Sequence, residues 1–240
     1  MNKLFKKTEL SLKNSKKVFI PNLTSQLSYE VAFKNIKKNN KFLDLGCGNG
    51  ILGIALFKSK KIKKVYASDV SKDAIKIAKI NFVNNKVKFD LRLGSLFKPW
   101  WGISSEKEKF DYILNDVSAI SSLLAKKSTW FGKNIPCAAG KDGSKLSINI
   151  IKNSKFFLKK NGSLQIPILS LSNRKKILKT AKENFSIVRI ALSKEWFLPK
   201  EMLKLRKTLV KYKLKRYINY QIKFNNLICK TEIIICRKFK

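Results

Sequence analysis

The chain has 240 residues, 44% of them hydrophobic, and this length and composition suit one domain with a full hydrophobic core. Because the chain contains no histidine, a Ser-His triad, a zinc-histidine site and an imidazole base are excluded. Its formal net charge of +38 at pH 7 directs attention to anionic partners such as nucleic acid.

The first 17 residues are predicted to form a basic arm. They lack the apolar core of a signal peptide, and no stretch of the chain approaches the length needed to span a membrane. The four cysteines form no C-x-x-C pair, so neither a zinc ribbon nor a redox motif is indicated. We therefore expect a cytoplasmic protein in a reducing compartment, with an arm over residues 1–17 and one domain over residues 18–240.

Residues 42–50, which read FLDLGCGNG, form an apolar strand that breaks into a loop with glycine at alternate positions. Gly46, Gly48 and Gly50 let the backbone turn sharply and let a ligand lie directly against it. Asp44 precedes them, so its carboxylate can point into the same space. The helix predicted over residues 51–57 presents its positive N-terminus to the loop, which favours an anionic group on the ligand.

Two classes of ligand fit this loop. Residues 48–53 match the dinucleotide pattern G-x-G-x-x-G, but that interpretation would bury Asp44 in a parallel sheet without a partner. The alternative uses two acids. Asp44 would accept hydrogen bonds from a ligand's ammonium group or a backbone-bound water. Asp69, about 20 residues further on at the end of the next strand, would chelate two ribose hydroxyls.

Strands that alternate with helical stretches along the chain predict an α/β fold with a doubly wound, mostly parallel sheet. Residues 71–84 carry an apolar stripe at helical spacing, and residues 87–93 alternate apolar and polar side chains as in a half-exposed edge strand. Asp142 is a candidate N-cap for a helix that runs to residue 159 and stops at Asn161 and Gly162. Later strands are expected at residues 163–169, 185–192 and 228–237.

With these features the sequence resembles the class I S-adenosylmethionine-dependent methyltransferases over residues 18–240. Residues 44–50 look like the first motif of that family, and Asp69 looks like the ribose-binding acid of the second. The resemblance implies a Rossmann-like, seven-stranded sheet with an antiparallel last strand, and S-adenosyl-L-methionine as the cofactor. It implies that the cofactor is bound by Thr24, Asp44, Gly46, Cys47, Gly48, Gly50, Asp69, Ser95, Leu96 and Asn115.

Within that family the sequence is most similar to the HemK/PrmC-type enzymes, which methylate a glutamine side-chain amide, and to related small-domain enzymes that act on RNA. Residues 19–27 resemble the segment that lies over the cofactor, residues 110–118 the strand that ends in Asn-Pro-Pro-Tyr, and residues 140–143 a Gly-x-Asp-Gly helix start. The resemblance implies methyl transfer to a nitrogen of a protein side chain, either a glutamine amide or a lysine. Two alternatives stay open: an RNA base as the acceptor, and a fold that binds cofactor or RNA without methylating anything.

The acceptor motif departs from the family pattern. Asn115, which would position the acceptor, is kept, while Asp116, Val117 and Ser118 replace the two prolines and the tyrosine. Asp116 becomes a candidate catalytic group that accepts a proton from an amine or hydroxyl acceptor. The competing interpretation is that Asp116 caps a helix over residues 118–125.

An aromatic wall for the acceptor could come from tryptophan-bearing loops in place of the lost tyrosine. The candidates are Trp130 with Phe131 and Trp100 with Trp101, although tryptophans more often serve in packing. At the third motif, Ser95 stands where the family often has an acid that contacts the adenine amine, and its hydroxyl can accept the same hydrogen bond more weakly.

The positive charge has two explanations. Only six of the 53 basic residues are arginine, the residue that nucleic-acid sites favour for bidentate contacts, so part of the lysine excess reflects AT-rich codons. With only 15 acids in the chain, the surface is still positive enough to attract RNA or a ribosome-associated protein acceptor, and no membrane partner is expected. The densest basic stretch is an insertion over residues 200–223. There the apolar residues Leu203, Leu205, Leu209, Val210 and Leu214 predict an amphipathic helix, and Tyr212, Tyr217 and Tyr220 are candidates for RNA contact.

Overall fold

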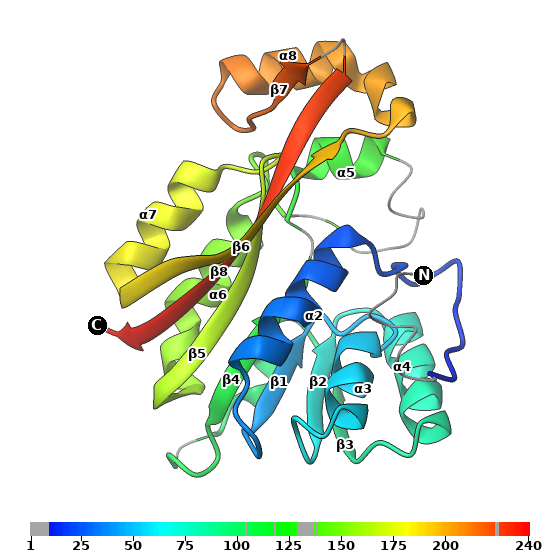
Figure 1. The fold of residues 1–240 in the computed structure, drawn as a ribbon, viewed down its shortest axis with the longest axis vertical. Helices are drawn as coiled ribbons and strands as arrows, with labels where there is room; N and C mark the ends of the chain where they lie inside the picture. The colour runs from blue at the N-terminus through cyan, green and yellow to red at the C-terminus, as the bar shows by residue number, and fades with distance from the viewer. Residues whose placement is uncertain (1–9, 104, 118, 129–136, 138, 224–225) are drawn as a thin grey trace.

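A central β-sheet organises the molecule. The computed structural model describes residues 10–240 except 104, 118, 129–136, 138 and 224–225. Within these ranges an eight-stranded sheet has the order β3-β2-β1-β4-β5-β8-β6, with the short β7 paired to β8 (Figure 1). The strands are β1 (Phe42–Leu45), β2 (Val65–Asp69), β3 (Phe89–Leu93), β4 (Phe110–Asn115), β5 (Leu158–Leu169), β6 (Phe185–Phe197), β7 (Gln221–Lys223) and β8 (Asn226–Phe239).

The strand directions confirm the predicted fold class. β1 pairs in parallel with β2 and β4, β2 with β3, and β4 with β5. β8, the last strand of the chain, is antiparallel to both of its neighbours, β5 and β6. β3 lies at one edge of the sheet, as the alternating pattern of residues 87–93 predicts. The short β7 is an addition to the seven strands that were expected.

Helices cover both faces of the sheet (Figure 1). The helices are α2 (Leu23–Asn35), α3 (Ile51–Lys58), α4 (Lys72–Asn84), α5 (Ser122–Lys127), α6 (Lys145–Asn153), α7 (Arg174–Asn184) and α8 (Arg206–Leu214), with 3-10 turns η1 (Lys98–Trp100), η2 (Ser154–Phe156) and η3 (Lys200–Leu205). None of those in the described ranges is long and apolar enough to cross a lipid bilayer.

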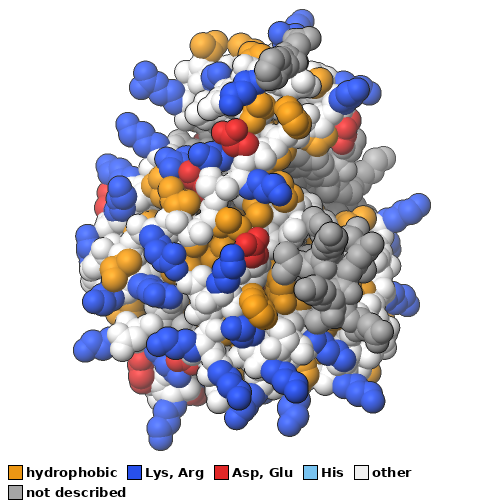
Figure 2. All heavy atoms as spheres, in the orientation of Figure 1, with side chains coloured by type: hydrophobic (Ala, Val, Ile, Leu, Met, Phe, Trp, Pro, Cys, Tyr) orange, Lys and Arg blue, Asp and Glu red, His pale blue; other side chains and the backbone are white. Residues whose placement is uncertain are grey.

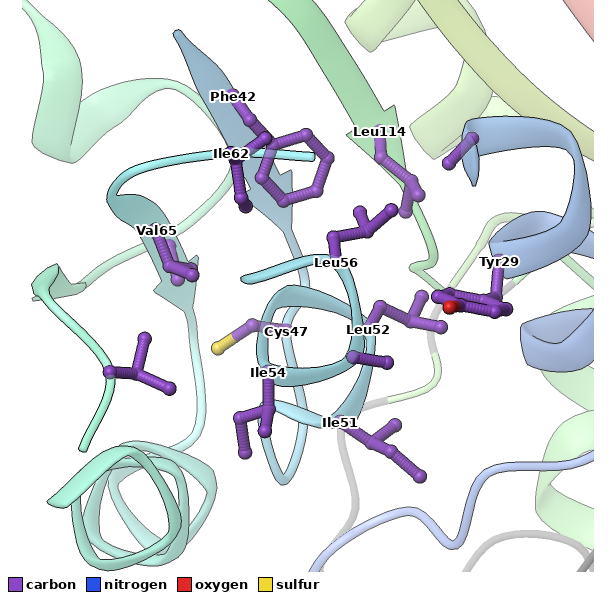
Figure 3. Packing of buried hydrophobic residues seen from close by; sticks show 14 of the residues in the cluster. Tyr29, Phe42, Cys47, Ile51, Leu52, Ile54, Leu56, Ile62, Val65 and Leu114 are labelled. Carbon is purple, nitrogen blue, oxygen red and sulfur yellow. The ribbon is translucent and has the colours of Figure 1, made fainter. Parts of the chain in front are cut away.

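Alternate side chains of β1 face opposite cores, as the pleat of a strand requires. Phe42 belongs to one hydrophobic cluster with side chains of α2, α3 and α4, among them Tyr29, Leu52 and Leu56 (Figure 3). Leu43, the next residue, faces the second core, which α6 and α7 cover. Both faces of β1 are therefore buried, and Asp44 is a carboxyl group enclosed by the sheet and its helices.

The predicted end of the helix that follows residues 140–143 is wrong. α6 stops at Asn153, the 3-10 turn η2 follows, and β5 already begins at Leu158. Residues 161–162, which were expected to end the helix, lie inside β5. A side chain at Gly162 would come within 3.0 Å of the carbonyl oxygens of Lys159 and Phe110, so glycine is needed there for close strand packing. The register of the β4–β5 pair shifts at this place.

The basic insertion folds differently from the predicted single amphipathic helix. The 3-10 turn η3 precedes the short helix α8, and Val210 and Leu214 are exposed. Leu209 is buried as predicted, and it packs in one cluster with α5 together with Met202, Tyr212, Ile218 and Tyr220. This insertion lies at the end of the molecule beyond α5 (Figure 1).

Candidate active site

A cavity of about 360 Å³ lies at the carboxyl ends of β1, β2 and β4. Its walls are the glycine loop after β1, the start of α4, the loop after β3 and the first turn of α2. In an open parallel sheet, ligands bind where the strand order reverses, and here that point lies between β1 and β4. The fold therefore places this cavity where a ligand is expected.

The cavity collects most of the residues that were assigned to the site from the sequence. It is lined by Thr24, Gly46, Cys47, Gly48, Asp69, Ser95, Leu96 and Asp116. Asp44, Gly50 and Asn115 do not line it, and all three are buried. Gly50 serves as the N-cap of α3, while Asp44 and Asn115 each have 0% of their surface exposed.

The glycine loop has the left-handed backbone that the motif implies. Gly46 has a φ of +76°, and a Cβ there would come within 2.6 Å of a Val117 methyl group, so this position allows only glycine. Gly48 has a φ of +55°, but a Cβ there would meet nothing within 4 Å. Gly48 therefore presents bare backbone to open space, which lets a ligand approach the main chain closely.

Asp69 holds this loop in place from the end of β2. One carboxylate oxygen accepts a hydrogen bond from the Gly48 N–H at 3.0 Å, and the other accepts one from the Ser71 N–H at 2.9 Å. Burial raises the pKa of Asp69, while these backbone donors lower it. Asp69 thus organises the loop as well as lining the cavity.

Asp44 is a buried acid without a hydrogen-bond partner among the described residues. Neither of its carboxylate oxygens is paired, although the side chain is fully buried. Burial raises the pKa of Asp44 well above its usual value, and the charges of Asp116 and Asp69 raise it further. The Gly53 N–H acts in the opposite direction without completing a hydrogen bond. An unpaired buried carboxyl group is unfavourable, so this site suits a ligand that brings a positive charge or a donor.

Asn115 and Asp116 stand side by side after β4. The Asn115 side-chain oxygen accepts the Val117 N–H at 3.0 Å, while its buried Nδ2 has no partner among the described residues. One oxygen of Asp116 accepts a hydrogen bond from the Ser25 hydroxyl at 2.7 Å. Burial raises the pKa of Asp116 to about 7, whereas the Ser25 hydroxyl lowers it. Asp116 is half-buried, and the cavity is the space that it faces.

The competing assignment of Asp116 as a helix cap is wrong. The helix in question, α5, begins at Ser122, and its N-cap is Ser121, whose side chain accepts the Leu124 N–H. The Asp116 carboxylate is instead bonded to Ser25 on α2. Asp142 also does not cap its helix directly, because Ser144 is the N-cap of α6.

Asp142 joins the starts of two helices. Burial alone would raise its pKa, but hydrogen bonds from the Ser144 hydroxyl and N–H, the Lys176 charge and a hydrogen bond from Asn173 bring it below the ordinary value. Asn173 is the N-cap of α7, and its side chain donates to Asp142 at 3.1 Å. The residue is therefore structural, and it fixes α6 against α7.

The tryptophans do not form an acceptor wall within the described ranges. Trp100 is 1% exposed, packs edge-on against Phe110 and donates a hydrogen bond to the Ser68 hydroxyl at 3.1 Å. Trp101 is exposed, and neither residue lines the cavity. Trp130 and Phe131 lie outside the residues that the structure describes. Among the described residues, the cavity lining includes the aliphatic side chains of Ala119, Ile120, Leu146, Pro167 and Leu169, and Phe19 is its one aromatic side chain.

Residues 10–17 are held against α4 by hydrogen bonds that sequence reasoning missed. Asn81 of α4 accepts the Lys13 N–H at 2.7 Å and donates to the Lys13 carbonyl at 3.0 Å. Asn85, one turn later, makes the same pair of bonds with Ser11, at 3.2 and 2.7 Å. The chain then passes along the cavity at residues 17–19. The spacing of four between the two asparagines on one helix was the available signal.

Comparison with known proteins identifies the family. Residues 14–117 match the family described as methyltransferase small domain. The bifunctional methyltransferase of Rickettsia typhi is 32% identical over 151 residues, which are 61% of this chain and 28% of that protein. A putative protein N5-glutamine methyltransferase of Methanocaldococcus jannaschii is 31% identical over 145 residues, which are 60% of this chain and 70% of that protein.

The solved structures agree on the fold. A ribosomal protein L11 methylase from Lactobacillus delbrueckii subsp. bulgaricus superposes with a TM-score of 0.54 at 19% identity, covering 92% of this chain and 81% of the other. The chain spans only 28% of the length of the Rickettsia relative, so likeness to that protein concerns one part of it. Because the archaeal relative is matched over 70% of its length at 31% identity, the chain belongs to the class I methyltransferases, among which it resembles the HemK/PrmC-type enzymes.

Proposed function

We propose that this protein is an S-adenosylmethionine-dependent methyltransferase that methylates a nitrogen of a protein side chain. The observation that carries the proposal is one cavity with the glycine loop and Asp69 on one side and Asp116 on the other. S-adenosyl-L-methionine would supply a methyl group that its sulfonium already makes electrophilic, so the protein has mainly to align the acceptor. The names of the relatives support a protein acceptor.

The residues of the cavity fit this cofactor. Asp69 can accept hydrogen bonds from ribose hydroxyls through the lone pairs that the loop leaves free, and Gly48 offers bare backbone to the ligand. Asp44 does not line the cavity, so the cationic end of the cofactor would stabilise its buried, unpaired carboxylate through charge attraction and not through a direct contact. Ser95 and Leu96 would lie along the adenine, with Thr24 and Cys47 completing the walls.

Asn115 and Asp116 support a glutamine amide as the acceptor. A primary amide carries both an acceptor oxygen and N–H donors, and Asp116 offers a carboxylate acceptor in the cavity. The unpaired Asn115 Nδ2 is buried outside the cavity lining, so it would serve as the matching donor only if its side chain turned toward the bound acceptor. Asp116 would take an N–H hydrogen bond and so direct the nitrogen lone pair toward the methyl group.

Lysine is the second candidate, and the Asp116 carboxyl group is the observation that favours it. A protonated amine must lose its proton before it can attack, and a carboxyl group with a pKa of about 7 can take that proton. An RNA base is the remaining candidate, and Phe19 is the one aromatic side chain among the described residues of the cavity on which it could stack. The four free thiols suit a reducing cytoplasm.

We infer a macromolecular partner of mixed or negative charge. Lysine and arginine side chains are spread over the whole visible face in Figure 2, without one concentrated patch. Such a field attracts ribosomes or other RNA-rich particles as well as acidic proteins. Two of the three tyrosines of the insertion, Tyr212 and Tyr220, do not support stacking on RNA, since they are only 8% and 7% exposed. The third, Tyr217, is half-buried and packs edge-on against Tyr212.

A labelling experiment tests the function and separates the acceptors. The protein is incubated with methyl-labelled cofactor and a cell extract freed of small molecules, and the product is treated with protease or nuclease. Protease-sensitive label supports the proposal. Acid hydrolysis then splits N-methylated glutamine amides to labelled methylamine, whereas methyl-lysine survives. Label in the nuclease-sensitive fraction would identify RNA as the acceptor instead. Calorimetric cofactor binding with no transfer to either fraction would support a non-catalytic module.

A further inference from the structure

The acceptor side of the cavity contains a hydrogen bond that ties α2 to the loop after β4. The Ser25 hydroxyl donates to Asp116 Oδ2 at 2.7 Å, across 91 residues of sequence. Ser25 lies in the first turn of α2 and is 2% exposed, so water does not compete for this bond. The Asp116 backbone is fixed as well, because its N–H donates to the Leu45 carbonyl at 3.1 Å.

This bond leaves the other carboxylate oxygen of Asp116 available. No described residue donates a hydrogen bond to Oδ1, and Asp116 lines the cavity. A carboxylate that is held at one oxygen has little rotational freedom, so its second oxygen keeps a fixed direction. One oxygen is thus anchored in the protein and the other faces the place of the acceptor.

The hydroxyl also acts on the charge of Asp116. Burial disfavours the ionised carboxylate, and the Ser25 hydroxyl favours it by donating a hydrogen bond. Of the other charged groups around the cavity, Asp44 on β1 and Asp69 on β2 are acids that disfavour further negative charge, and Lys17 comes from the N-terminal segment. Ser25 is the contact that counteracts burial at Asp116.

We propose that Ser25 is a positioning residue for methyl transfer, which orients the Asp116 carboxylate toward the acceptor nitrogen and favours its ionised form. The proposal rests on the proposed function. In the transfer, the acceptor nitrogen forms a bond to the methyl carbon, the bond from that carbon to the donor sulfur breaks, and the sulfur keeps the electron pair. The proton that the nitrogen gives up passes to Asp116.

Three serine variants test the role of the hydroxyl. Ser25→Ala removes the hydrogen bond, and Ser25→Thr keeps a hydroxyl at the same place. Ser28→Ala is the matched control, because Ser28 is equally buried on α2 but its hydroxyl has no partner among the described residues. We expect Ser25→Ala to raise the midpoint of the pH–rate profile by about one to two pH units, and to lower turnover at pH 7 about ten-fold.

A structural role would not produce this pattern. In Ser25→Ala the KM for the cofactor should stay within about two-fold of the wild-type value, and turnover should recover above about pH 9, where Asp116 ionises without help. Ser25→Thr and Ser28→Ala should keep the wild-type profile. A Ser25→Ala protein with an unchanged pH profile, or one that loses turnover equally at every pH, would overturn the proposal.

A second measurement separates this inference from the proposed function. Carbon-13 labelling of the aspartate carboxyl groups lets NMR follow the ionisation of Asp116 directly, with Asp116→Asn identifying its signal. The midpoint should be near 7 in the wild-type protein and higher in Ser25→Ala. Equal midpoints would contradict the inference even in an active enzyme. A raised midpoint in a protein that binds cofactor but methylates nothing would instead contradict the proposed function, and with it any role of Ser25 in transfer.

Discussion

Asp69 combines two tasks that are normally described separately. Its carboxylate already accepts hydrogen bonds from the Gly48 and Ser71 N–H groups, and the residue lines the cavity. Loop order and ligand affinity should therefore be lost together when this side chain is shortened. The residue is a better probe of the cofactor site than Asp44, which the cavity does not reach.

We predict that Asp69→Ala weakens binding of S-adenosyl-L-methionine by roughly 10- to 100-fold, the range expected for one charge-assisted hydrogen bond. Isothermal titration calorimetry measures the change. Asp90→Ala is the matched control, because Asp90 is an acid on the neighbouring strand β3 that pairs with Arg92 and does not line the cavity. Unchanged affinity in a folded Asp69→Ala protein would show that the cofactor binds elsewhere.

The Asp116 carboxylate should lower the stability of the folded protein while it supports methyl transfer. Its folded-state pKa of about 7 lies above the value near 4 of an unfolded aspartate. The unfolded state therefore ionises first as pH rises, and the wild-type protein loses stability between about pH 4 and pH 7. Asp116→Asn removes this titration, so its melting temperature should exceed that of the wild type by an amount that grows over this range and then stays constant.

The same substitution should lower turnover by roughly 100-fold while cofactor affinity changes by a few fold at most. Thermal melts at several pH values and steady-state kinetics give the two measurements. A variant that keeps normal turnover would exclude Asp116 from the reaction. A variant that melts below the wild type at pH 7 would show that the contacts of the carboxylate stabilise the folded protein by more than its burial destabilises it.

At the scale of single residues, the sequence predicted those site residues that lie close together along the chain. The glycine loop and Asp69 follow from spacing along one strand–loop–helix unit, and both line the cavity. Ser25 could not be predicted in the same way, because its partner is 91 residues away in the sequence. From the sequence alone, a serine near the start of a helix suggests only a helix cap. The sequence also could not predict that the buried Nδ2 of Asn115 lacks a hydrogen-bond partner among the described residues.

At the scale of helices and strands, local sequence signals gave wrong boundaries where tertiary packing determines the structure. Asn161 and Gly162 are a common signal for the end of a helix, yet they lie inside β5 at a place where two strands approach too closely for a side chain. In the insertion, the leucine pattern suggested one helix face, but the 3-10 turn η3 changes the phase so that Met202 and Tyr212 are buried and Leu214 is exposed.

The N-terminal segment depends on α4 through one buried side chain in particular. The Asn81 amide bonds to Lys13 in both directions and also donates to the Asn49 carbonyl in the glycine loop at 2.9 Å. We predict that Asn81→Ala releases residues 10–17 and destabilises the protein by about 2–4 kcal/mol, because buried backbone groups lose their partners.

Limited trypsin digestion followed by mass spectrometry checks this prediction. Cleavage after Lys13, Lys16 or Lys17 should become markedly faster in Asn81→Ala than in the wild type. Asn153→Ala is the control, since that exposed amide at the end of α6 bonds only within its own helix. If the two variants are digested at the same rate, the segment is held by Asn85 and by the apolar contacts of Leu10 and Leu12, and not by Asn81.

For the whole molecule, the strand order matters more than any single motif. Only the order β3-β2-β1-β4-β5 places the ends of β1, β2 and β4 together, and so joins Gly48, Asp69 and Asp116 around one cavity. Alternation of strands and helices along the sequence predicts a doubly wound sheet but not its strand order, and the Rossmann-like, seven-stranded form of the sheet came from resemblance to a family. The antiparallel β8 was predicted in the same way.

The net charge of +38 should affect how the whole molecule binds anionic partners. Since lysine and arginine cover the visible face in Figure 2 without one dense patch, we predict binding to RNA that depends on charge and not on sequence. The affinity should fall by a factor of 10³ or more between about 50 and 200 mM salt, measured by fluorescence anisotropy with a labelled RNA oligomer. Heparin of matched charge should compete equally well, because it offers the same field without bases. Selective binding of one RNA sequence that persists at about 0.5 M salt would contradict this prediction and point to a defined RNA site.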